Sequence, residues 1–140
     1  MQEPDRAGAR GRGISARWVA AAAALAYMGA IFALSHTSHP PIPAFFHGWS
    51  DKALHAVQYA PLAFLWGAAF RGSPGRRALL GWVVAGVFGL TDELHQGFVP
   101  GRHASVLDWI ADLAGAAAGA CLLALALRLS SLRRRGGPRP

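Results

Sequence analysis

The sequence is poor in cysteine and in charged residues. Its one cysteine, Cys121, excludes an internal disulfide and a metal site built from several cysteines. Cys121 stands in an apolar run, so we interpret it as a small buried side chain. Charged residues make up 15% of the 140 residues, whereas a soluble domain usually has about 25%. Because 53% of the residues are hydrophobic, the composition indicates one small membrane domain.

Lysine is scarce as well, and the basic residues are unevenly placed. The net charge is +7, and all of the 14 basic residues except Lys52 are arginine. Most of the arginines stand near the two ends of the chain or in the short segment 71–77. The sequence has no basic stripe interleaved with aromatic residues, which argues against nucleic acid as a partner. The distribution instead fits the rule that basic residues stay on the cytoplasmic side of membrane helices.

Four apolar segments alternate with shorter polar segments that contain proline or glycine. Each apolar segment is long enough, or nearly so, to cross a hydrocarbon core of roughly 30 Å at about 1.5 Å per residue. The sequence therefore predicts an all-α polytopic membrane protein, with four transmembrane helices in a small antiparallel bundle. The prolines in residues 35–50 favour an extended loop there. The expected spans are residues 18–34, 51–70, 78–97 and 105–129.

The regions outside the bundle set its predicted orientation. We expect a disordered basic tail at 1–16, a four-helix membrane domain at 17–130 and a basic cytoplasmic tail at 131–140. With four spans, all basic residues except Lys52 and Arg102 fall on one side, so both termini are predicted to be cytoplasmic. In the alternative, the first apolar run is a cleaved signal peptide, which leaves three spans in the same orientation.

A polar stretch interrupts the apolar pattern between the third and fourth spans. It reads TDELHQGFVPGR over residues 91–102 and continues to Asp108 and Asp112. Ionisable groups between membrane-spanning segments are costly, so their presence suggests a function. A second polar group heads the second span, and its members share one helical stripe. They are Asp51, His55, Gln58 and Tyr59.

The depth of three of these side chains can be measured along each helix from an arginine at the opposite end. The distance is about 22 Å in the third span and about 24 Å in the second and fourth. The pairs are Asp92 with Arg77, His55 with Arg71, and Asp112 with Arg128. The spacing therefore predicts one polar site, on the outer side of the membrane, built from three helices.

The chemistry of these side chains suggests their roles. Asp92 or Asp112 is the predicted base, and His55 is its predicted partner. Arg102 and Lys52 can hold a phosphate or a carboxylate, and Arg102 is better suited to bidentate binding. The predicted catalytic residues are Asp92, His55 and Asp112, and the predicted substrate-binding residues are Asp51, Lys52, Gln58, Tyr59, Glu93, Gln96, Arg102, Ser105 and Asp108.

Three interpretations of this set stay open. In a structural interpretation, Asp92 or Asp112 pairs with Arg102 or Lys52, and the network fixes the bundle. In an enzymatic interpretation, the set performs acid/base chemistry on a lipid-linked or wall-derived substrate. In a binding or transport interpretation, the set holds a ligand or a proton, and transport would require an oligomer.

A metal site is not favoured by the sequence. Its candidate ligands would be His55, His95, Asp92 and Asp108, but no paired-histidine motif is present. We therefore predict neither a metal nor another cofactor.

The fourth span carries two further signals. Ser105 is a plausible N-cap, with Asp108 three residues later in the arrangement of a capping box. Gly115 and Gly119 follow Asp112 on the same helical stripe and form a small-residue surface for close helix approach. This surface could also support a homo-oligomer.

The ordered motifs of the chain resemble the VanZ-like family of small bacterial membrane proteins. The resemblance covers roughly residues 18–127, and one departure is Asp112, where the family often has asparagine. The matching motifs are FALS at 32–35, DKxxHxxxYxxL at 51–62, DExxQxFVPGRxxSxxD at 92–108 and DxxGxxxG at 112–119.

The resemblance implies a place and a role for the protein. The place is the bacterial cytoplasmic membrane, which the chain crosses several times, with the lipid bilayer as a partner. The family is named for a protein linked to resistance against teicoplanin, a glycopeptide that acts on the cell wall, so an envelope role is implied. A lipid-linked cell-wall precursor or a glycopeptide-related ligand is then the expected partner. The resemblance supplies no reaction, so enzymatic activity is left open.

Overall fold

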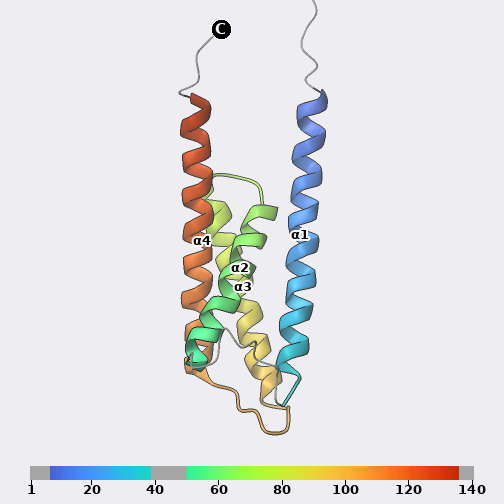
Figure 1. Ribbon diagram of the computed structural model, residues 1–140, viewed down its shortest axis with the longest axis vertical. Helices are drawn as coiled ribbons and strands as arrows, with labels where there is room; N and C mark the ends of the chain where they lie inside the picture. Colours follow the sequence, from blue (N-terminus) through green and yellow to red (C-terminus); the bar gives the residue numbers. More distant parts are fainter. Residues whose placement is uncertain (1–6, 39–49, 136–140) are drawn as a thin grey trace, which may run out of the picture.

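The chain folds into four helices, as the sequence predicts. The computed structural model describes residues 7–38 and 50–135. Every regular element within these ranges is an α-helix (Figure 1). The helices are α1 (Ala7–Ser35), α2 (Asp51–Ala69), α3 (Pro74–Gln96) and α4 (Val106–Arg135).

The helices form an antiparallel bundle in which α2 and α3 lie between the longer α1 and α4. Figure 1 shows successive helices running in opposite directions, so that the start of α1 and the end of α4 lie at the same end of the bundle. The packing is closest between α4 and the pair α2 and α3, while α1 contacts α2 and, more weakly, α3. The opposite end of the bundle therefore gathers the starts of α2 and α4 and the end of α3.

Serine N-caps fix where the helices begin. Ser50 accepts a hydrogen bond from the backbone N–H of Ala53, and Ser73 accepts one from Arg76. Pro74 follows the second cap at a position where its missing N–H costs nothing. The third helix consequently begins at Pro74, earlier than the expected start near residue 78.

The first and last helices extend beyond the apolar spans expected from the sequence. The first helix begins at Ala7, although residues 1–16 were expected to be disordered, and the fourth continues to Arg135. The physical reason is that extending an existing helix by one residue is far easier than nucleating a new helix. The helices formed by the apolar spans therefore continue into the polar residues beside them. Residues 1–6, 39–49 and 136–140, which include most of the expected loop at 35–50, lie outside the described residues.

Small residues line the contacts between the helices, which lets the helices approach closely. An added Cβ on Gly115 would collide with the carbonyl oxygen of Ala56, and one on Gly119 would collide with that of Ala60. The predicted small-residue surface is therefore real, but α2 of the same chain occupies it. A second copy could not use this face without displacing α2. The buried core joins all four helices through Ile31, Tyr59, Leu62, Ala63, Ala85 and Ala116.

Two arginines hold the end of α2. Arg77 of α3 donates from Nε to the carbonyl of Gly67 at 3.1 Å and from a terminal nitrogen to that of Ala68 at 3.0 Å. Arg17 of α1 donates to the carbonyl of Ala69 at 2.9 Å. The last carbonyls of a helix have no partner within the helix, so these guanidinium groups satisfy them.

Two helices meet the requirements for crossing a membrane by length and composition. They are α1, over Ala16–Ser35, and α4, over Val106–Arg134. The helices α2 and α3 do not meet these requirements, and each carries charged and polar residues near its ends. Large hydrophobic side chains are nevertheless exposed on all four helices, among them Leu25, Phe64, Val83, Val87 and Leu122.

Candidate functional site

Polar residues of α2, α3 and α4 meet near the starts of α2 and α4 and the end of α3, which lie together at one end of the bundle in Figure 1. At the centre of this site, His55 Nδ1 lies 2.9 Å from Asp112 Oδ1. Glu93 Oε1 approaches the same ring nitrogen at 3.8 Å. The prediction that the polar groups of the second and fourth spans meet is thus confirmed. We call His55, Glu93 and Asp112 the inner cluster.

The carboxylate of Asp112 is wholly buried, and a glycine makes room for it. A Cβ added to Gly89 of α3 would lie 3.1 Å from Asp112 Oδ2 and 3.1 Å from the ring of Tyr59. Tyr59 is 1% exposed and belongs to the core, with its ring centroid 6.2 Å from that of Phe88. The prediction that Tyr59 contacts a substrate is therefore not supported, because the packed helices cover its ring.

Glu93 is fixed by the start of the fourth helix. The backbone N–H of Ser105 donates to Glu93 Oε2 at 2.7 Å, which leaves the other oxygen facing His55. The hydroxyl of Ser105 accepts a hydrogen bond from the N–H of Asp108 at 3.3 Å. The predicted N-cap is confirmed, and it accounts for Ser105 without a contact to substrate.

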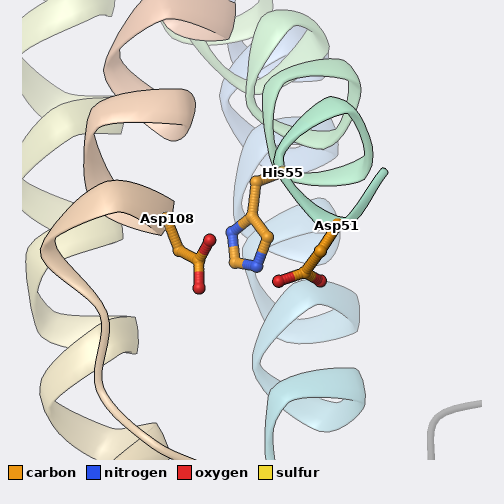
Figure 2. Close-up of side chains that lie close together, drawn as sticks. All are labelled: Asp51, His55 and Asp108. Carbon is orange, nitrogen blue, oxygen red and sulfur yellow. The ribbon is translucent and has the colours of Figure 1, made fainter. Parts of the chain in front are cut away.

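A second, more open group lies beside the inner cluster. Lys52 forms ion pairs with Asp108 and, at 3.3 Å, with Asp51. Figure 2 shows the ring of His55 between the carboxylates of Asp51 and Asp108, with one ring nitrogen on the side of each. Lys52 and Asp51 are exposed, whereas Asp108 is largely buried. We call Asp51, Lys52 and Asp108 the rim.

Asp92 belongs to a separate network on the side of α1. Ser35 donates to Asp92 Oδ2 at 2.6 Å, and Gln96 donates to the same oxygen at 3.0 Å. Successive residues on a helix point about 100° apart, so Asp92 faces α1 while Glu93 faces α2 and α4. The structure therefore pairs His55 with Asp112, and the prediction of Asp92 as an alternative partner of His55 is wrong.

The remaining predicted residues lie outside both groups. A terminal nitrogen of Arg102 is 3.5 Å from the carbonyl of Leu34, which places the guanidinium against the end of α1. In the described ranges Arg102 forms no ion pair with Asp92 or Asp112, contrary to the structural interpretation of the sequence. Gln58 is half-buried one turn beyond His55.

The metal set considered from the sequence is not assembled. His95 lies with its Nε2 3.1 Å from Nδ1 of His36 and stacks on Phe32, at the α1 side of the bundle. It therefore contacts α1 rather than the rim, and it shares no cluster with His55 among the described residues.

Sequence reasoning did not assign Ser35 to the site. The residue ends the first apolar run, at the level where that run becomes polar, and this is the signal that could have found it. Being 4% exposed, it ties α1 to the polar end of α3 through Asp92.

The charges of the inner cluster and the rim are strongly acidic. Four carboxylates, from Asp51, Glu93, Asp108 and Asp112, face one lysine and one histidine. Such a site attracts a cation or a hydrogen-bond donor and repels a phosphate. The prediction that Arg102 and Lys52 can hold a phosphate or a carboxylate gains no support here, because Lys52 already has two carboxylate partners and Arg102 lies against the end of α1.

Two helices long and apolar enough to cross a membrane, in a bundle with a polar site at one end, fit a helical membrane protein. The VanZ/LLP1 family matches residues 16–127, and the chain belongs to that family. The match confirms the resemblance drawn from the motifs and spans most of the bundle. Neither the curated proteins nor the solved structures contain a match to the chain.

Proposed function

We propose that all four helices cross the bacterial cytoplasmic membrane, with both termini in the cytoplasm and the polar site facing outward. The second and third helices are about 28 Å and 34 Å long at about 1.5 Å per residue, which suits a core of roughly 30 Å. Their exposed Phe64, Val83 and Val87 would face lipid rather than water. The arginine-rich end would be cytoplasmic by the positive-inside rule.

The first helix is proposed to be retained rather than cleaved. Its Ile31 is 1% exposed in the core, and Ser35 is hydrogen-bonded to Asp92. Removing α1 would expose both the core and this carboxylate. An epitope tag fused to the N-terminus should therefore stay on the mature membrane protein; a mature chain without the tag would contradict this.

Within this topology, we propose that the site binds a cationic or hydrogen-bond-donating group of an envelope molecule. The observation that carries this proposal is the excess of carboxylates around His55. The resemblance to the VanZ-like family implies an envelope ligand, either a lipid-linked cell-wall precursor or a glycopeptide, and the chain belongs to that family. An amine on such a molecule could take the place of the Lys52 ammonium at the rim, since Lys52 is exposed and its side chain is flexible.

Acid/base catalysis is the second candidate function. It is favoured by the bond from His55 Nδ1 to a buried carboxylate, which orients an imidazole so that its other nitrogen can accept a proton. Figure 2 shows that the ring reaches the rim, where a ligand would be bound.

The test is to compare conservative variants for teicoplanin susceptibility and membrane abundance. Asp108→Asn and His55→Gln should lose any protective effect at normal abundance. Asp92→Asn is the matched control, because Asp92 is also a buried carboxylate but lies in the other network. If the two site variants lose the phenotype only when abundance falls, the site is structural and the proposal fails.

A further inference from the structure

The inner cluster has the composition of a metal site, although no paired-histidine motif marks it. His55, Glu93 and Asp112 each offer one ligand atom, and these atoms lie within 4.8 Å of one another. They come from three different helices, so only the folded bundle brings them together. Ligand atoms around one Zn²⁺ at bond lengths of about 2.1 Å are roughly 3.0–3.5 Å apart. The observed separations of 2.9 Å and 3.8 Å bracket that range.

A second observation points to a ligand between these side chains. Glu93 Oε1 has no hydrogen-bond partner among the described residues. Asp112 Oδ2 has none either, but it lies beside Gly89, away from the oxygen that meets His55. Glu93 is 4% exposed and Asp112 is 0% exposed, so water reaches neither carboxylate readily. Glu93 Oε1 is the oxygen turned toward His55, because Ser105 holds the other one. Buried polar atoms of this kind normally have a partner.

The charge of the inner cluster also favours a divalent cation. Two buried carboxylates beside one imidazole leave an excess of negative charge inside the bundle, which is costly. A divalent ion with two carboxylates and a neutral imidazole makes the cluster neutral. One nitrogen and two oxygen ligands suit Zn²⁺ or Mn²⁺, since such sets are too hard for metals that prefer sulfur.

The rim supplies the outer contact that such sites usually have. A metal-bound histidine generally gives its other ring N–H to a carboxylate. Figure 2 shows the second ring nitrogen of His55 on the side of Asp51. Asp51, His55 and Asp108 also lie within 4.8 Å of one another through their ligand atoms.

We propose that His55, Glu93 and Asp112 bind a divalent metal ion, Zn²⁺ or Mn²⁺, with Asp51 orienting the imidazole. This proposal deepens the proposed function, because it assigns the buried part of the same site. It also makes His55 a metal ligand rather than a free base, so metal content distinguishes it from the acid/base candidate. The rim remains the place where the envelope ligand binds.

The test uses the full-length chain, purified in detergent without a histidine tag and stripped with a chelator. Equilibrium dialysis against Zn²⁺ or Mn²⁺ should give about one ion per chain. Asp51→Asn removes an outer contact and should weaken metal binding roughly 10- to 100-fold. Glu93→Gln and Asp112→Asn each remove a ligand and should weaken it by more than that. Asp92→Asn, with its carboxylate in the other network, should bind as the original chain does.

Three outcomes would overturn the proposal. The first is a folded chain that binds neither ion and whose unfolding temperature neither ion raises. The second is binding that survives both Glu93→Gln and Asp112→Asn. The third is binding that His95→Gln removes, which would place the ion at the exposed His36–His95 pair.

Two checks keep these outcomes distinct. Glu93→Gln should fold, because the new amide keeps an oxygen that can accept from the N–H of Ser105, and circular dichroism measures this. If the protein binds the metal as expected but the site variants leave teicoplanin susceptibility unchanged, the metal proposal stands and the envelope function is refuted.

Discussion

His55 and Asp112 share a hydrogen bond of 2.9 Å across the interface between α2 and α4. The carboxylate is buried, and the two residues are on the helices that pack most closely. The polar site therefore lies at the tightest helix contact. Only conservative substitutions can separate an effect on the chemistry of the site from an effect on the stability of the fold.

The first prediction follows from this contact. Asp112→Ala should destabilise the bundle by about 1–3 kcal/mol, because it leaves a cavity and removes the partner of a half-buried imidazole. Asp112→Asn should cost less, since its amide oxygen can still accept from His55. Thermal unfolding in detergent measures both. Equal losses for the two variants would mean that the hydrogen bond does not stabilise the fold.

A second prediction concerns the glycine surface. Gly115→Ala and Gly119→Ala should each destabilise by about 1–3 kcal/mol or more, because the new Cβ meets backbone that cannot move aside. Gly29→Ala is the matched control. No described atom outside its own helix lies within 4 Å of a Cβ at Gly29, and alanine favours a helix. Unfolding temperatures should fall for the first two variants only, and an unchanged Gly115→Ala would place α2 elsewhere.

A third prediction addresses the contact between α1 and α3. Ser35→Ala should destabilise by about 1–3 kcal/mol, since Asp92 would lose a buried donor. Thr37→Ala is a suitable comparison, because its exposed hydroxyl donates to the carbonyl of Ala33 in the last turn of α1. Membrane abundance and thermal stability should both separate the two variants. Similar values would show that α1 is not held by this network.

A fourth prediction tests the topology. A reporter that is active only outside the cytoplasm should be inactive in segment 71–77 and active in segment 98–104, because the two lie at opposite ends of the bundle. Activity at 71–77 would reverse the proposed orientation. Insertions should follow Gly72 and Gly101, whose positive φ angles mark turns outside the helices.

A fifth prediction distinguishes the rim from the inner cluster. Lys52→Ala should lower the unfolding temperature only modestly, because Lys52 is itself exposed and its ion pair with the exposed Asp51 contributes little, although its other partner, Asp108, is largely buried. It should nevertheless alter ligand binding, since it removes the only cation beside Asp51 and Asp108 among the described residues. Binding of an amine-bearing glycopeptide by the purified protein is the measurement. Unchanged binding would place the ligand away from the rim.

Much of the architecture follows from the sequence. Apolar length predicted four helices, and distance from the arginines predicted that His55 and Asp112 share a level. Helix ends were less accurate, because they depend on caps such as Ser73 and on how far a formed helix extends past its apolar part.

The rotation of each helix about its axis could not be predicted. Asp92 and Glu93 are neighbours in sequence, but they point to different helices, and only the packing decides which one meets His55. The same holds for Gly115 and Gly119, whose spacing suits contact within the chain or between two copies equally well. Spacing along the sequence thus predicts the depth of a side chain in the bundle more reliably than the neighbouring helix toward which it points.

Arg77 serves orientation and architecture together. In the proposed topology its positive charge marks the cytoplasmic side, and its guanidinium holds the last carbonyls of α2. Moving such charges is the usual way to force a membrane protein to insert upside down. In this bundle, moving the charge of Arg77 would also remove its hydrogen bonds to the end of α2. A chain that inserted upside down for this reason would therefore be misfolded as well. Arg77→Lys separates the two effects, because it keeps the insertion signal but loses the two-pronged contact.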